Sequence, residues 1–180
     1  MALIAITGVP GTGKSSVSKL LAEGGDTVFD LNKTVFEHNF ILGHDEERDS
    51  AEVDMDALSN FALALEGKDT RTIFLEGHVS HLLPVDLIIV LRCRPTVLKK
   101  RLEARDWSKG KVRENLEAEA MAVITHECLD SGIDTYEIDV SDIKVEDIMS
   151  SVLDIVRGDK DLENFRPGRI DFFQEILKWC

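Results

Sequence analysis

The sequence is poor in cysteine and lacks any long apolar run at its amino terminus. Its three cysteines, Cys93, Cys128 and Cys180, form no C-x-x-C pair, so neither a zinc site nor a disulfide framework is indicated. Unpaired thiols suit a reducing cytosol, and we expect a cytoplasmic protein. The apolar start, residues 1–7, is followed at once by glycines and a lysine, and it is too short for a signal peptide or a membrane span.

Basic side chains are also scarce relative to acidic ones. The sequence has 21 lysines and arginines and 34 acidic residues, which gives a formal net charge of −13. Such a surface repels phosphate backbones, so direct nucleic-acid binding is not expected. It would attract a basic protein, although solubility alone explains the acidity equally well. The chain of 180 residues is 43% hydrophobic, which is enough for one domain, residues 1–180, with a packed core.

Short apolar runs alternate with amphipathic segments along the chain. Runs typical of strands buried on both faces span residues 2–7, 27–30, 72–75, 87–91 and 135–138. Helical periodicity is expected over residues 14–23, 31–40, 55–66, 95–105, 111–129, 145–156 and, in a last helix, 170–177. Residues 43–54 are dense in acids and predict a mobile surface loop. The alternation predicts an α/β fold of three layers, with a five-stranded parallel sheet between helices.

A phosphate-binding pattern follows the first expected strand. Residues 8–15 read Gly-Val-Pro-Gly-Thr-Gly-Lys-Ser and meet every position of GxxxxGK[ST]. Glycines let main-chain amides turn inward around phosphates, and a helix beginning near Gly13 directs its positive end at them. Lys14 would reach the β- and γ-phosphates, and the Ser15 hydroxyl would bind Mg²⁺. A strand before the loop and a helix after it favour a P-loop for ATP and Mg²⁺ over a chance glycine turn.

An acid lies at the end of the third expected strand, in the sequence Glu76-Gly77-His78. In P-loop folds the carboxyl edge of the sheet faces the nucleotide. Glu76 could hold the Mg²⁺ shell through water or orient an attacking group, and His78 could position a water or a phosphate. The alternative is a surface loop with an ordinary histidine. The remaining histidines show no metal-ligand spacing and are expected at the surface: His38, His44, His81 and His126.

A basic cluster stands out in this acidic chain. Its members are Arg92, Arg94, Lys99, Lys100, Arg101, Arg105, Lys109, Lys111 and Arg113. Arg101 and Arg105 are four residues apart and would share a helix face just before a break at residues 106–110. Phosphoryl transfer needs cations that close over the γ-phosphate, so we predict catalytic roles for both arginines. The alternative is a solvated helix face, which suits Lys99 and Lys100 best.

Four segments together carry a family resemblance. They are the P-loop, the Glu-Gly-His of residues 76–78, Val-Leu-Arg-Cys-Arg-Pro-Thr-Val-Leu-Lys-Lys-Arg-Leu of residues 90–102, and Lys-Val-Arg-Glu-Asn-Leu-Glu-Ala-Glu of residues 111–119. The chain thereby resembles one branch of the nucleoside-monophosphate kinases, that of the coilin-interacting nuclear ATPase and ribosome-assembly adenylate kinase with its yeast and archaeal relatives. The resemblance covers about residues 1–157. Residues 159–180 form a carboxyl-terminal extension beyond it.

The resemblance implies a parallel-sheet core with a nucleoside-monophosphate-binding segment at residues 30–53 and a lid at residues 104–114. By position it implies that Arg105 contacts the ATP phosphates and that the following residues bind ATP: Gly11, Gly13, Lys14, Ser15 and Ser16. The implied activity is that of an adenylate kinase, in which ATP and AMP give two ADP, together with ATP hydrolysis. The implied biological role is small-subunit ribosome maturation, through binding of a basic small-subunit ribosomal protein.

The sequence departs from that family in two places. Glu76 stands where members often carry aspartate, so the acid is kept and is one methylene longer. Ordinary adenylate kinases place an arginine shortly after the acid-glycine pair to clamp the AMP phosphate, whereas residues 77–80 contain none. Lys33 is the remaining cation suited to that phosphate, and lysine lacks the bidentate fork of arginine. We expect an adenylate kinase-like phosphotransferase with ATPase activity; an assembly ATPase with incidental kinase activity, or a kinase for another small molecule, are the alternatives.

Overall fold

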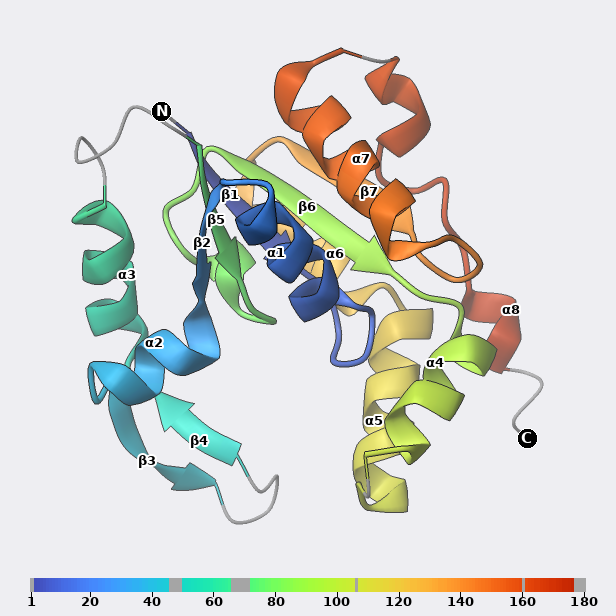
Figure 1. Cartoon of the computed structure of the whole chain (residues 1–180). Helices are drawn as coiled ribbons and strands as arrows, with labels where there is room; N and C mark the ends of the chain where they lie inside the picture. The colour runs from blue at the N-terminus through green and yellow to red at the C-terminus, as the bar shows by residue number, and fades with distance from the viewer. Residues whose placement is uncertain (1, 46–49, 66–71, 106, 160, 177–180) are drawn as a thin grey trace.

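The computed structural model describes residues 2–45, 50–65, 72–105, 107–159 and 161–176. A parallel sheet of five strands runs through its centre, in the order β2-β5-β1-β6-β7 (Figure 1). Its strands are β1 (Leu3–Thr7), β2 (Thr27–Asp30), β5 (Ile73–Glu76), β6 (Leu87–Arg92) and β7 (Thr135–Asp139). The predicted α/β fold is confirmed.

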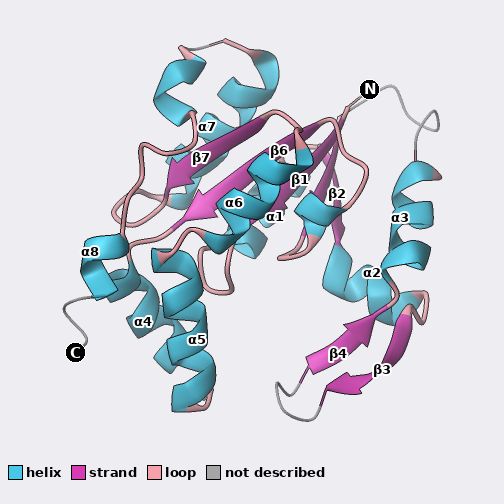
Figure 2. Cartoon of the chain, turned by 180° about the vertical axis from the view of Figure 1, so that it is seen from behind, coloured by secondary structure: helices cyan, strands magenta, loops and turns pink. Residues whose placement is uncertain are grey.

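Helices cover both faces of the sheet because side chains of a strand alternate between its faces (Figure 2). Ile4 and Ile6 of β1 belong to the apolar cluster of α1 (Lys14–Glu23) and α7 (Val145–Arg157). Leu3 of the same strand belongs to the cluster of α3 (Met55–Leu63), and Ala5 packs with Cys128 of α6 (Val123–Ser131). The central strands are therefore apolar on both faces, which is why they read as continuous apolar runs.

The prediction of one helix over residues 111–129 is wrong, because the chain breaks into α5 (Lys109–Ala120) and α6. Ala122, between them, has a left-handed backbone with a φ of 52°. The carbonyl oxygen of Glu119 accepts a short-range bond from the Ala122 amide at 3.1 Å and a second from Arg92 Nη2 at 2.9 Å. The end of α5 is thus fixed by an arginine of β6, a partner that local periodicity does not reveal.

The acidic stretch predicted as a mobile loop forms an antiparallel hairpin in its described part. β3 (Ile41–Asp45) pairs with β4 (Ser50–Val53), and Ile41 lies opposite Val53. These two side chains pack on the apolar cluster that contains α2 (Leu31–Glu37). Residues 46–49 lie outside the described residues. Burial alternates along β3 with the two-residue period of a strand. This period predicts the strand better than the high density of charge predicts a loop.

Two segments extend from the carboxyl edge of the sheet, one on each side of the P-loop (Figures 1 and 2). The first holds α2, β3 and β4. The second, called the arm here, holds α4 (Pro95–Glu103) and α5. Near the carboxyl terminus, α8 (Phe173–Ile176) packs on α5 and begins at Phe173, later than the predicted start of the last helix at residue 170. No helix within the described ranges has the length and apolarity needed to cross a membrane.

Candidate functional site

The loop between β1 and α1 depends on glycine at the positions where the motif requires it. Gly8, Gly11 and Gly13 have φ angles of 136°, 92° and 99°, in the region that other residues rarely adopt. A Cβ on Gly8 would lie 2.5 Å from the carbonyl oxygen of Leu91, so this backbone passes close against β6. The loop is therefore held against the sheet edge, with α1 beginning directly after Gly13.

Lys14 is buried inside this loop, with 7% of its surface exposed. Its Nζ donates hydrogen bonds to the carbonyl oxygens of Gly8 at 2.7 Å and Val9 at 3.1 Å. Burial lowers the pKa of Lys14 to about 8, while the Glu76 carboxylate acts against burial and the Arg105 charge acts with it. The ammonium group thus lies in a place where additional negative charge, such as that of a phosphate, would stabilise it.

Ser15 and Glu76 are brought together from two adjacent elements. The Ser15 hydroxyl lies 3.4 Å from Glu76 Oε1, to which it donates, and Glu76 ends β5 beside β1. Burial raises the pKa of Glu76, with the Lys14 charge opposing this rise. A hydroxyl and a carboxylate oxygen are hard ligands of the kind that Mg²⁺ prefers. The residues present therefore fit the predicted cation.

The two histidines after β5 differ in their surroundings. His78 is exposed, yet enough protein atoms surround its ring to lower its pKa, and the charges of Lys14 and His81 act in the same direction. The prediction that His81 lies at the surface is wrong: it is 4% exposed, with Nδ1 3.0 Å from the Thr7 hydroxyl and Nε2 3.0 Å from Glu127 Oε2. The 3₁₀ turn Ser80–Leu82 directs it inward. Three others are exposed as expected: His38, His44 and His126.

Arg101 and Arg105 both reach the P-loop. They line a cavity of about 400 Å³ together with Gly11, Thr12, Gly13, Ser16, Ile143, Val145 and Ile148. Arg101 Nη1 donates to the carbonyl oxygen of Gly11 at 3.3 Å, and its Nη2 donates to that of Val140 at 3.3 Å. Arg105 is exposed, and its guanidinium lies 5.7 Å from the centroid of the Trp107 ring. It follows α4 in the turn beyond Glu103, so the two arginines share the cavity but not a helix.

Two other arginines of the basic cluster, one at the end of β6 and one just after it, do not line the cavity at the P-loop. Arg92 is buried and forms ion pairs with Glu119 and Glu137. Arg94 is bound at 2.9 Å to Asp142 Oδ2. The buried carboxylates were not predicted from the sequence. The signal that could have found them is an arginine at the end of an apolar strand, because a buried arginine requires a buried counter-charge.

Lys33 lies on the other side of the P-loop, at the start of α2. It is exposed, and its Nζ is 3.8 Å from Asp30 Oδ2. Its charge is close enough to act on Glu76, whose pKa it lowers slightly against the larger effect of burial. Glu76 is thus within electrostatic reach of Lys14 on one side and of Lys33 on the other.

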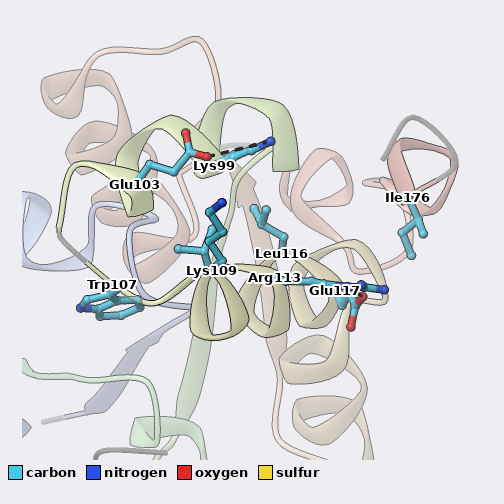
Figure 3. Close-up of a pocket in the computed structure, with 9 residues that line it drawn as sticks. Lys99, Glu103, Trp107, Lys109, Arg113, Leu116, Glu117 and Ile176 are labelled. Atoms are coloured by element: carbon cyan, nitrogen blue, oxygen red, sulfur yellow. Dashed lines mark hydrogen bonds and ion pairs between the residues drawn. The ribbon is translucent and has the colours of Figure 1, made fainter. Parts of the chain in front are cut away.

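A larger cavity of about 770 Å³ lies away from the P-loop, between α4, α5 and α8 (Figure 3). Its apolar lining consists of Trp107, Val112, Leu116 and Ile176. Two ion pairs along the helices account for four of its five charged side chains, Lys99 with Glu103 at 3.9 Å and Arg113 with Glu117 at 2.6 Å, and Lys109 is the fifth. No P-loop residue lines this larger cavity. The smaller cavity, which P-loop residues do line, is therefore the candidate nucleotide site.

Comparison with known proteins shows the family of the chain. A family model described as "AAA domain" matches residues 4–122. A protein of Archaeoglobus fulgidus named "Putative adenylate kinase" is 42% identical over 175 residues, which cover 97% of this chain and 93% of that protein. A protein of Methanocaldococcus jannaschii with the same name is 40% identical, covering 98% of this chain and 96% of that protein.

Solved structures show a likeness of fold. A deoxyadenosine kinase from M. mycoides with bound dATP aligns with a TM-score of 0.51 at 16% identity, over 86% of this chain and 99% of that one. The archaeal relatives are far more similar in sequence and extend over nearly the whole chain. The protein therefore belongs, with these archaeal relatives, to the nucleoside-monophosphate kinase family of P-loop proteins.

Proposed function

We propose that the protein is an adenylate kinase-like phosphotransferase that transfers the γ-phosphoryl group of ATP to AMP, giving two ADP, and that also hydrolyses ATP. The observation that carries this proposal is the meeting of Lys14, Ser15 and Glu76 beside the cavity that holds Arg101 and Arg105. The name shared by the archaeal relatives, "Putative adenylate kinase", supports the kinase part of this proposal.

On the ATP side, the chain's own residues would bind and neutralise the phosphates. Lys14 would exchange its bonds to the Gly8 and Val9 carbonyls for bonds to the β- and γ-phosphate oxygens. Gly11, Gly13 and Ser16 would line the nucleotide site, and Arg101 and Arg105 would neutralise charge that develops on the transferring group. Mg²⁺, held by Ser15 and by Glu76 directly or through water, would draw charge from the phosphate oxygens.

On the acceptor side, residues 30–53 would form the segment that binds the monophosphate, and residues 104–114 would form the lid. Lys33 would bind the AMP phosphate as a single point charge, without the fork that arginine offers. We therefore expect weak AMP binding. His78, with its lowered pKa, would be neutral at physiological pH and able to orient a phosphate or a water. Water admitted in place of AMP accounts for the proposed ATPase activity.

Chromatographic measurement of ADP tests the proposal. ADP formation is measured with ATP and Mg²⁺ alone, then with AMP, dAMP, CMP, GMP or UMP added, and the Lys14→Ala variant controls for contaminating kinases. The proposal expects the largest rise with AMP and a slower, AMP-independent rate with ATP alone. A rise only with another acceptor would favour a kinase for that small molecule. Equal rates with and without every monophosphate would refute the kinase and leave an ATPase.

A second candidate is an assembly ATPase of the ribosome-assembly branch, with a basic small-subunit ribosomal protein as its partner. It is supported by the net charge of −13 and by the acidic hairpin, which carries Asp45 and Glu52 in its described part. Glu46, Glu47 and Asp49, which extend this acidic stretch, lie outside the described residues. A cytoplasmic location belongs to either proposal, and the buried free thiols of Cys93 and Cys128 suit it.

This candidate predicts salt-sensitive binding, because attraction between opposite charges is screened over about 8 Å at physiological ionic strength. The wild type and a variant with Asp45, Glu46, Glu47 and Asp49 changed to their amides are compared in pull-downs at low salt. The variant should recover less of a basic small-subunit ribosomal protein while binding ATP normally. Equal recovery would refute a role for these acids. Recovery by neither protein would favour a metabolic adenylate kinase.

A further inference from the structure

The arm leaves the sheet at the end of β6 and returns to it at the end of α5, and both points meet at Glu119. One oxygen of this side chain, Oε1, accepts from the Cys93 amide at 2.9 Å and from Arg92 Nε at 2.8 Å. In return, Arg92 Nη2 donates to the main-chain oxygen of Glu119 at 2.9 Å. A single carboxylate and a single guanidinium therefore join the two ends of the arm.

A second buried carboxylate, Glu137 of β7, binds the same arginine, and its other hydrogen bonds among the described residues go to Thr125 and Gly168. Its Oε1 accepts from Arg92 Nη1 and from the Thr125 hydroxyl, and its Oε2 accepts from the Gly168 amide at 3.1 Å. Arg92, Glu119 and Glu137 are 1%, 3% and 2% exposed. The ring of Phe172 covers the guanidinium at 5.5 Å from its centroid. Glu137 thus ties Arg92 to α6 and the carboxyl-terminal extension, whereas Glu119 ties it to the arm.

The base of the arm is also connected to the P-loop. Leu91, the residue before Arg92, presents its carbonyl oxygen to Gly8 so closely that a Cβ there would lie 2.5 Å from it. Arg101 of α4 donates to the carbonyl oxygen of Gly11. The charge of Glu119 acts on Lys14, whose pKa it raises against the larger effect of burial. A shift of α4 and α5 at their base would therefore change the contacts of the phosphate loop.

We propose that Glu119 is a positioning residue of the phosphoryl-transfer site, because its bonds to Cys93 and Arg92 set how the arm presents Arg101 and Arg105 to the P-loop. This inference rests on the proposed function. Misplacing a group that acts in the transition state by about 1 Å costs on the order of 10²-fold in rate. Loosening the base of the arm should thus lower kcat, while ATP affinity, which Lys14 and the loop amides provide, should change little.

Glu119→Gln is the first variant. It keeps an oxygen that can accept from Cys93, and Arg92 keeps Glu137 as its counter-charge, so the fold should survive. Two matched variants accompany it. Glu137→Gln removes an equally buried carboxylate from the same arginine but leaves the arm's own bonds in place. Glu117→Gln removes a surface partner of Arg113 from the same helix.

For Glu119→Gln we expect kcat to fall about tenfold and KM for ATP to stay within about twofold, the pattern of a lost transition-state interaction. Hydrogen exchange of the α4 and α5 amides should accelerate, while that of α1 should not. Glu137→Gln should lower Tm with kcat largely retained, and Glu117→Gln should match the wild type in both measurements. If Glu119→Gln fails to fold, Glu119→Asp replaces it. Aspartate keeps the charge on a side chain that is one methylene shorter, so the carboxylate lies farther from Arg92 and Cys93. We expect the same fall in kcat.

The pH profile adds a readout that a purely structural role would not move. Burial raises the pKa of Glu119 to about 7; Arg92 of β6 opposes this rise, and Glu137 of β7 adds to it. Lys14 of the P-loop is the other charge that interacts with it. As pH falls through 7, protonation weakens the bonds to Arg92 and Cys93, so wild-type kcat should fall on this acid limb. The limb should be absent in Glu119→Gln.

Two results would overturn the inference. The first is unchanged kcat together with unchanged α4 and α5 exchange in Glu119→Gln. The second is an equal loss of kcat in Glu119→Gln and Glu137→Gln that follows their loss of Tm, which would mean that the cluster serves stability alone. If the wild type shows no AMP-dependent transfer, the proposed function fails, and the exchange measurement still decides whether Glu119 joins the ends of the arm.

Discussion

The two sides of the P-loop are built in different ways. On the ATP side, Lys14 is buried and bonded to main-chain oxygens, and the loop backbone passes close against β6 at Gly8. On the side proposed to bind the acceptor, Lys33 is exposed, and its ion pair with Asp30 is long at 3.8 Å. Buried groups are positioned by the core, whereas an exposed ion pair contributes little fixed geometry. If the proposed function holds, this comparison predicts a preformed ATP site beside an acceptor site that gains most of its order from its ligand.

The largest effect is expected from a change in the P-loop itself. Lys14→Ala should lower both AMP-dependent transfer and ATP hydrolysis by about 10³-fold or more, the scale of losing a cation that stabilises the transferring group. The fold should persist because the change removes a buried charge and leaves the loop backbone in place. Steady-state rates and a thermal melt check this. Near-native turnover by a folded variant would contradict the P-loop assignment.

The next effect concerns the arm. Arg105→Ala should lower kcat by roughly 10²-fold, because the guanidinium stabilises charge that develops only during transfer. KM for ATP should change less, since the ground state carries less of that interaction. Lys99→Ala, which removes a paired surface lysine of α4, is the matched control and should leave both constants unchanged. If KM alone rises in Arg105→Ala, this arginine binds ATP and does not act in the transition state.

A smaller effect is expected on the acceptor side. Lys33→Ala should raise KM for AMP about tenfold, the scale of one lost charge-assisted hydrogen bond, with ATP hydrolysis unchanged. Lys19→Ala, an exposed lysine of α1 paired with Glu23, is the control. Titrating AMP at saturating ATP gives the values. An unchanged KM for AMP would remove Lys33 from the acceptor site and show that this phosphate binds elsewhere.

The smallest expected effect is a dependence of kcat/KM for ATP on pH, which tests the buried Lys14 side of the comparison. The pKa of Lys14 is lowered to about 8 by burial, so the free enzyme loses this positive charge as pH rises through 8. kcat/KM for ATP, which reports the free enzyme, should therefore fall above about pH 8. The fall in kcat should begin at higher pH, because bound phosphates favour the charged ammonium. A flat kcat/KM between about pH 7 and about pH 9.5 would contradict a functional ammonium with this pKa.

The sequence was sufficient where structure depends on neighbours along the chain. The P-loop could be predicted because its glycine positions follow from the backbone angles that it needs, and the central strands β1, β5 and β6 because burial on both faces demands apolar runs. The features that were missed depend on distant partners. α5 ends where Arg92 binds Glu119, 27 positions away, and His81 turns inward toward Thr7 and Glu127. The roles of Arg105 and Lys33 stay predictions, because they concern contacts with a ligand.

The most direct test of phosphoryl transfer to AMP follows the phosphorus atom itself. The enzyme is given ATP labelled at its γ-phosphate, with Mg²⁺ and unlabelled AMP, and the products are separated. The account predicts that label appears in the β-phosphate of ADP at a rate that rises with AMP, with a minor fraction in inorganic phosphate, and that Lys14→Ala forms neither. Label found only in inorganic phosphate, at the same rate with and without AMP, would contradict it.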